Sequence, residues 1–309
     1  MSHFTVMIIG DSPEEQLAPF NEHIEMDEYE KEPVSEIDKQ RFIKCYTKAQ
    51  EGRSYGVQSE SKAEANAKLS FDDLYDEFKH DWNTGSWKKN KDGIFVEVST
   101  YNPKSKWDWY QLGGRWSRML KLKKDAKGIN GSPSFSTKEQ IPKEGYADSA
   151  LLKDIDFEGM IKEAEKEARK RYNKVLNLCE GEIPTVEVLW DELFDEEGKH
   201  KDLDNKRDFY FDQPSIKYFN EKCAGKKVRY NLEEFQISKK EYITDAAKTA
   251  LSISVFSLLK NGTWYEKGKI GWFASVSDAK KTSDWSDEII QHLKEVDGNT
   301  LISIYDCHI

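Results

Sequence analysis

The chain has 309 residues and a formal net charge of −10, and 34% of its residues are charged while 12% are aromatic. That length suffices for one large domain or two ordinary ones, and the aromatic content is typical of a folded protein. The negative charge disfavours broad binding to nucleic acids or to anionic membranes, because both require a concentrated basic surface; a local basic groove stays compatible with it.

The four cysteines are widely spaced, which is atypical of a zinc knuckle or a disulfide framework, so we expect reduced thiols. The first residues lack the basic region of a signal peptide, and no apolar run approaches the ~18 residues of a membrane helix. We therefore expect a soluble protein of the cytoplasm that does not bind membranes.

The N-terminal third begins with an apolar, β-branched run at residues 4–9, which predicts a buried strand near the centre of a sheet. Residues 14–38 hold ten acids against one base and predict an irregular acidic loop. Helices are expected at residues 36–46 and after the N-cap Ser70, and the polar stretch 51–68 is expected to be flexible. The elements of this third end with an alternating strand at residues 94–100.

The rest of the chain is rich in helix signals. Asp156 is the expected N-cap of the strongest predicted helix, which ends at Gly181, and Pro184 begins a second helix through residue 194. Asn261 and Gly262 predict a hairpin turn. A helix is expected at residues 239–251 and a strand at 252–259. The partner strands of the hairpin are expected at 263–266 and 269–277. A helix at 283–298 and a final strand at 299–309 complete the chain.

This order predicts an α+β fold with a mostly antiparallel sheet that includes the N- and C-terminal strands. The sheet is expected to contain residues 4–9 and 94–100 together with three strands after residue 251. The helical segment forms a flanking or inserted layer. We expect three parts. Residues 1–155 form the N-terminal part of the core, residues 156–236 form the helical layer, and residues 237–309 form the C-terminal part of the same core.

Residues 101–116, YNPKSKWDWYQLGGRW, form the most unusual motif. The glycine pair permits positive φ or close approach of another group, and the arginine supplies a planar five-donor fork. Aromatic walls, free amides and this arginine suit a nucleotide base and phosphate; alternatively, Arg115 pairs with Asp108 and the motif is a structural corner. The candidate ligand-binding residues are Trp107, Trp109, Tyr110, Gly113, Gly114, Arg115 and Trp116.

The C-terminal YDCHI is the second candidate site. In a strand, Asp306 and His308 share one face, and His3 lies on a strand expected in the same sheet. The candidate catalytic residues His3, Asp306 and His308 therefore converge in this interpretation, as half of a metal site or as a carboxylate-oriented imidazole. A plain surface pair is the alternative. The pattern leaves any metal or cofactor unknown.

The segments MSHFTVMIIG, NPKSKWDWYQLGGRW, GYAD, WYEKGKIGW and DCHI together resemble an uncharacterised family of proteins encoded by bacteriophages and by some bacteria and their mobile elements. The family has no established activity, so the resemblance implies context rather than chemistry. It implies an accessory phage protein, with a counter-defence role as one option, that acts in the cytoplasm of the host bacterium.

Three classes of function are compatible with these observations, and whether the protein is an enzyme stays open. The first is binding of a small anionic ligand, such as a nucleotide signal, through an aromatic and arginine pocket. The second is a nucleotide hydrolase or nuclease that uses the histidine and aspartate cluster. The third is an acidic, protein-binding inhibitor of a host defence protein, in which residues 14–38 imitate nucleic-acid charge.

Overall fold

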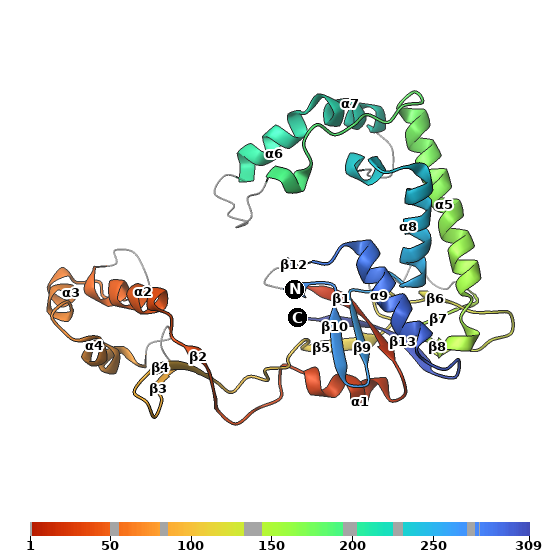
Figure 1. Cartoon of the computed structure of the whole chain (residues 1–309). Coiled ribbons are helices and arrows are strands. Elements are labelled where there is room, and N and C mark those ends of the chain that lie inside the picture. Colours follow the sequence, from red (N-terminus) through yellow and green to blue (C-terminus); the bar gives the residue numbers. More distant parts are fainter. Residues whose placement is uncertain are drawn as a thin grey trace. The chain divides into compact units, whose positions relative to one another are not determined.

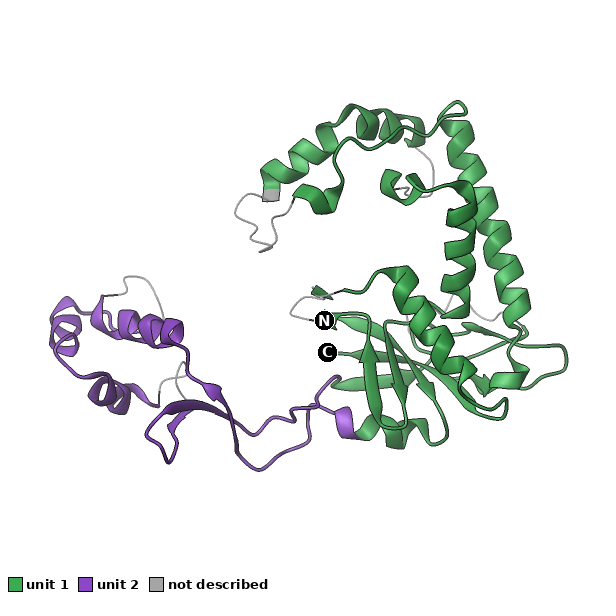
Figure 2. Ribbon diagram, viewed as in Figure 1, with its two compact units in different colours: residues 1–18, 107–309 green, residues 19–106 purple. Residues whose placement is uncertain are grey.

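The computed structural model describes residues 2–49, 56–80, 86–132, 144–193, 203–224, 231–270, 276–277 and 279–309 (Figure 1). The chain forms two compact units, of which unit 1 contains Met1–Ala18 and Trp107–Ile309 and unit 2 contains Pro19–Lys106 (Figure 2). Helices and mostly antiparallel strands occur in both units, which confirms the α+β prediction. Within the described ranges, no helix is long and apolar enough to cross a membrane.

The main sheet of unit 1 has the strand order β10-β9-β1-β13-β5, and β8 also pairs with β13. The two terminal strands lie side by side and antiparallel at its centre, with His3 opposite His308 and Ile9 opposite Ile302. The predicted central position of the first strand is thus confirmed, while β9 runs parallel to β1. The strands are β1 (His3–Ile9), β5 (Trp109–Leu112), β8 (Ser149–Leu151), β9 (Ser257–Lys260), β10 (Thr263–Glu266) and β13 (Leu301–His308).

The predicted place of residues 94–100 in this sheet is wrong. That strand, β4 (Phe95–Ser99), lies in unit 2 between β2 (Tyr29–Pro33) and β3 (Trp87–Lys89). Both of its hydrogen-bonding edges are therefore occupied by local partners. The strand that joins the terminal strands is β5, from the tryptophan-rich motif itself.

One face of the main sheet carries the core of unit 1. Met7 and Ile9 of β1 and Ile302 and Ile304 of β13 are buried there, because alternate residues of a strand share a face. Helix α9 (Thr282–Lys294) covers them through its buried apolar residues, which include Trp285. It begins one residue before the predicted amphipathic segment 283–298 and ends at Lys294, four residues before the expected stop at Gly298.

The long helices begin where their caps predict. The side chain of Asp156 accepts a hydrogen bond from the Gly159 amide at the start of α5 (Phe157–Leu178), and Ser238 forms a capping box at the start of α8 (Lys239–Leu251). The two helices pack side by side in Figure 1. The remaining helices of unit 1 are α1 (Pro13–Leu17), α6 (Leu203–Asp212) and α7 (Pro214–Cys223), and its short strand pairs are β6 (Leu120–Lys121) with β7 (Tyr146–Ala147) and β11 (Lys269–Ile270) with β12 (Val276–Ser277).

The prediction of a helix from Pro184 to residue 194 is wrong, since residues 184–193, the described part of this stretch, contain only a 3₁₀ turn at Trp190–Leu193. Its backbone donors bind side chains instead of helical carbonyls. The amide of Val186 donates to Gln236 and the amide of Val188 donates to Gln213. These side-chain acceptors satisfy the donors that a helix would have used.

The strand predicted at residues 252–259 is shorter than expected. Ile253 and Ser254 have φ values of 57° and 54°, so the chain passes through a left-handed turn after α8 and the strand begins at Ser257. The expected hairpin turn at Asn261–Gly262 has positive φ at both positions, as a type I′ turn requires. Residues 271–275 of the expected partner strand lie outside the described residues.

Unit 2 has an aromatic core of its own. Phe42 and Tyr46 of α2 (Glu36–Thr47), Tyr75 of α4 (Phe71–Phe78) and Trp87 of β3 pack together in it. Two expectations are corrected here, because β2 forms inside the predicted acidic loop and α3 (Glu60–Asn66) forms inside the stretch expected to be flexible. Buried Asn66 stabilises α3 by donating to the carbonyl of Tyr46.

Candidate functional site

The candidate site lies on the same face of the main sheet as the apolar core, at the ends of the terminal strands. Successive inward positions of β13 are Ile302, Ile304, Asp306 and His308, so the face changes from apolar to polar along the strand. His308 of β13 lies between two partners in the sheet. His3 of β1 is opposite it on one edge of β13, and Trp109 of β5 is opposite it on the other edge. The predicted convergence of His3, Asp306 and His308 is therefore what the structure shows.

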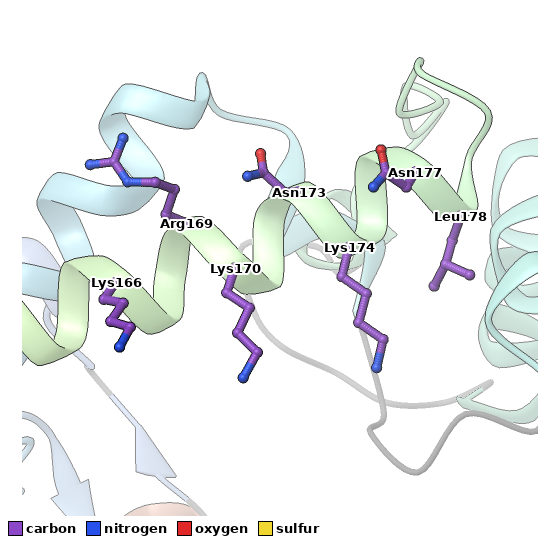
Figure 3. Close-up of a pocket in the computed structure, with 7 residues that line it drawn as sticks. All are labelled: Lys166, Arg169, Lys170, Asn173, Lys174, Asn177 and Leu178. Carbon is purple, nitrogen blue, oxygen red and sulfur yellow. The ribbon is translucent and has the colours of Figure 1, made fainter.

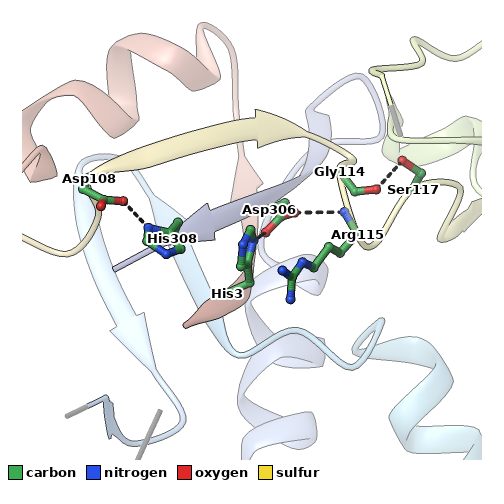
Figure 4. Close-up of polar contacts among 7 residues, drawn as sticks. All are labelled: His3, Asp108, Gly114, Arg115, Ser117, Asp306 and His308. Carbon is green, nitrogen blue, oxygen red and sulfur yellow. Dashed lines mark hydrogen bonds and ion pairs between the residues drawn. The ribbon is translucent and has the colours of Figure 1, made fainter. Parts of the chain in front are cut away.

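Asp306 is the buried centre of this group. Nδ1 of His3 donates to its Oδ1 at 2.8 Å, and the backbone amide of Arg115 donates to its Oδ2 at 2.9 Å (Figure 4). The carboxylate is fully buried, whereas 17% of the His3 side chain is exposed. Because Nδ1 is fixed by the carboxylate, Nε2 is the nitrogen of His3 that is left for a ligand or a proton.

His308 forms a second pair of the same kind. Its Nδ1 donates to Oδ1 of Asp108 at 2.6 Å, and its ring lies edge-on to the His3 ring with centroids 5.0 Å apart. Its Nε2 is buried and has no hydrogen-bond partner among the described residues. His3 is therefore the more accessible imidazole of the pair.

Arg115 does not form the predicted structural pair with Asp108, which bonds to His308 instead. The backbone of Arg115 is held in place because its amide donates a hydrogen bond to Asp306. Its side chain is exposed, and in Figure 4 the guanidinium extends on the side of the His3 ring. The site thus presents a cation that no described carboxylate neutralises, beside an oriented imidazole.

The two glycines before Arg115 are required by buried carboxylates. Gly113 and Gly114 have φ values of 73° and 53°. A Cβ at Gly113 would lie 2.6 Å from the carboxyl group of Asp148, and a Cβ at Gly114 would lie 2.5 Å from Oδ2 of Asp306. Because glycine has no Cβ, the backbone at Gly113 and Gly114 can lie close to the side chains of Asp148 and Asp306. This is the close approach of another group that the glycine pair predicts.

Asp148 also contacts this glycine turn, although it is not among the candidate site residues that the sequence predicts. It is fully buried, and its carboxylate accepts the backbone amides of Arg118 and Gly131. Burial raises the pKa of this carboxyl above its usual value, against the lowering effect of the two amides and of the Arg118 guanidinium. Asp148 is the last residue of the GYAD segment, but neither spacing nor periodicity assigns a role to this aspartate.

The aromatic residues of the motif divide between the interior and the surface. Trp107 is 4% exposed and donates to the carbonyl of Leu17, while the Tyr110 ring packs 4.8 Å from it. Trp116 packs against the core of unit 1. Trp109 is 45% exposed and lies 6.0 Å from the His3 ring, so it is the one indole of the motif that reaches the site.

Cys307 lies between Asp306 and His308 in sequence but points to the opposite face, where it is buried. Burial raises the pKa of its thiol well above the usual value, so it is not a thiolate nucleophile at neutral pH. Within the described part of the chain, no three histidine, cysteine, aspartate or glutamate side chains are grouped as a metal site.

Comparison with known proteins adds no assignment. No protein-family model matches the chain, no curated protein matches it, and no solved structure matches it. We call the cluster formed by His3, Trp109, Arg115, Asp306 and His308 the terminal-strand site.

Proposed function

We propose that the protein binds a small phosphate-bearing ligand of the nucleotide class at the terminal-strand site. The observation that carries this proposal is the shared carboxylate of Asp306, which binds His3 through one oxygen and the Arg115 backbone through the other. Through these two hydrogen bonds, Asp306 fixes the imidazole of His3 and the backbone of Arg115, whose guanidinium is exposed. The exposed Trp109 ring lies beside them.

Each of these groups matches one part of a nucleotide. The guanidinium of Arg115 binds phosphate oxygens through two parallel N–H donors. The indole of Trp109 stacks on the base, since such stacking does not depend on the identity of the base. The Nε2 atom of His3 provides a further contact to phosphate, and it donates when the ring is protonated.

The resemblance to a bacteriophage family supports a biological context for this binding. In that context the protein is a phage accessory protein in the cytoplasm of the host bacterium. It acts against host defence by sequestering a nucleotide signal. An interaction with a host defence protein through the acidic residues 14–38 is the remaining alternative for the partner.

Calorimetric titration with ATP, ADP, AMP, cyclic di-AMP and cyclic di-GMP tests the proposal. We expect heat of binding for at least one of these, and an increase of about tenfold or more in Kd for Arg115→Ala, since a hydrogen bond to a charged group contributes about 1.5–3 kcal/mol. The matched control is Arg41→Ala, because Arg41 is an exposed arginine that pairs with Asp38 in unit 2. Heat from no compound, or equal binding by Arg115→Ala, would exclude the site.

Hydrolysis of the bound nucleotide is a second candidate function, favoured by the fixed Nδ1 of His3. With that nitrogen held by Asp306, Nε2 of His3 accepts a proton from water while the water oxygen bonds to phosphorus and the leaving phosphate oxygen departs. Phosphate release by the wild type, lost in His3→Gln although that variant still binds nucleotide, would support this function. Binding without any turnover would limit the protein to sequestration.

A further inference from the structure

A second surface of unit 1 has the opposite charge to the chain as a whole. The C-terminal half of α5 exposes two parallel rows of side chains, each with four-residue spacing (Figure 3). They border an open concavity of about 680 Å³. We call this surface the α5 basic strip, and its rows are Lys166, Lys170 and Lys174 in one and Arg169, Asn173 and Asn177 in the other.

The four cations of the strip lie on the exposed side of the helix. Ala168 and Val175 are buried, whereas the three lysines and Arg169 are exposed. Asn173 is half-buried, and its side chain accepts a hydrogen bond from Lys239 of α8 at 2.6 Å. Residues 166–178 contain five bases and a single acid, Glu167, in a chain whose net charge is −10. The strip is thus a concentration of positive charge that the composition does not predict.

Folding of α5 does not account for this row of lysines. Lys166, Lys170 and Lys174 are successive i,i+4 neighbours, and like charges at this spacing destabilise a helix. The last turn of α5 contains no basic residue, so the strip is not placed to interact with the helix dipole, whose effect is confined to that turn. Lys170 lies 3.7 Å from Glu167, and because both side chains are largely exposed this pair adds little to the stability of the helix.

The geometry instead matches a linear array of negative charges. Four residues of α-helix advance by about 6 Å and turn about 40° beyond one full turn, so the three lysines present evenly spaced point charges along a gently winding row. A nucleic-acid strand is a linear series of phosphates, and lysine contacts to them need no base sequence. The neighbouring asparagines add polar contacts: the Asn177 amide can donate and accept, whereas the Asn173 oxygen already accepts from Lys239 and only its NH2 group is left to donate.

We propose that the α5 basic strip binds single-stranded nucleic acid through its phosphates, an activity beyond nucleotide binding at the terminal-strand site. The overall negative charge of the protein repels nucleic acid elsewhere and restricts contact to the strip. The strip contains four cations, so the logarithm of the association constant is expected to fall with the logarithm of salt concentration with a slope of about −3, or 0.7 per phosphate.

Fluorescence anisotropy with a labelled oligothymidylate of about 12 nucleotides measures this binding. In the triple variant Lys166→Gln, Lys170→Gln, Lys174→Gln we expect a loss of about tenfold or more in affinity and a slope near −0.7, the contribution of Arg169 alone. The control removes the same charge from exposed lysines outside the strip, through Lys124→Gln, Lys127→Gln and Lys294→Gln. It is expected to bind like the wild type.

Three results would overturn the proposal. The first is an absence of binding by the wild type at low salt, and the second is equal loss in the strip and control variants. The third is binding of an acidic peptide with the sequence of residues 22–34 as tightly as the oligonucleotide, which would identify the strip as a surface for acidic proteins. Circular dichroism of both variants verifies that α5 stays folded, and Arg169→Gln supplies the same test should the triple variant unfold.

Discussion

The imidazole of His3 is held at 2.8 Å by the carboxylate of Asp306, a residue 303 positions further along the chain. The antiparallel pairing of β1 with β13 brings the two ends of the chain together and creates this contact. The site therefore depends on the completed sheet rather than on any local motif. Asp306 thereby links His3 of β1 to the backbone of Arg115.

Replacement of Asp306 by asparagine is expected to lower the free energy of unfolding by about 1–3 kcal/mol. The amide has one acceptor oxygen, whereas the carboxylate accepts from both His3 and the Arg115 backbone, so either one of these partly buried N–H groups loses its acceptor or His3 has to change tautomer. Urea denaturation measures the change. Asp108→Asn is the matched control, because Asp108 is 28% exposed and water replaces its contact; an equal loss in both variants would contradict the central role of Asp306.

Gly114→Ala is expected to destabilise the fold more than Gly262→Ala. Both glycines have positive φ, at 53° and 72°, so both substitutions carry backbone strain of about 1–3 kcal/mol. Only at Gly114 does the new Cβ meet a neighbour, the buried Asp306, while nothing lies within 4 Å at Gly262. Thermal or urea unfolding of the two variants gives the comparison, and equal losses would show that Asp306 does not require the glycine.

The two tryptophans of the motif are expected to behave differently on replacement by alanine. Trp107→Ala should lower the free energy of unfolding by about 3–5 kcal/mol, because a buried indole and its hydrogen bond to Leu17 are lost. Trp109→Ala should cost far less, since that ring is 45% exposed, but it should weaken nucleotide binding. A strongly destabilised Trp109→Ala with unchanged binding would assign this ring to the fold.

Asp148 is expected to make the protein less stable as pH rises above 4. Its pKa is raised in the folded state, chiefly by burial, so the folded protein binds more protons than the unfolded chain between the usual pKa of 3.8 and the raised one. The free energy of unfolding therefore contains a contribution from Asp148 that decreases through this range. In Asp148→Asn this decrease should be absent from urea denaturation measured at successive pH values. An unchanged pH dependence would contradict the assignment.

Periodicity predicted those parts of the site that depend on a single strand. Alternation in the last strand placed Asp306 and His308 on one face, and the apolar first strand predicted a neighbour that would carry His3. Capping residues likewise predicted where α5 and α8 begin. These features depend on the local sequence and survive in the folded protein.

The features that could not be predicted depend on pairing between distant segments. Nothing in residues 94–100 indicates that β4 pairs with two strands of its own unit. Nor does it indicate that β5, rather than β4, pairs with β13 in the main sheet. The partner of Asp108 is His308, 200 residues away, rather than the nearby Arg115. Similarly, the helix predicted at Pro184 is replaced because the side chains of Gln213 and Gln236 bind its backbone donors.

The most direct test of nucleotide binding at the terminal-strand site is a double-mutant cycle on the dissociation constant of the tightest-binding nucleotide, with His3→Gln and Arg115→Ala. If both residues contact the same phosphate, each single variant should bind about tenfold or more weakly, and the double variant should bind more tightly than the product of the two losses implies. Wild-type affinity in both single variants would contradict the site.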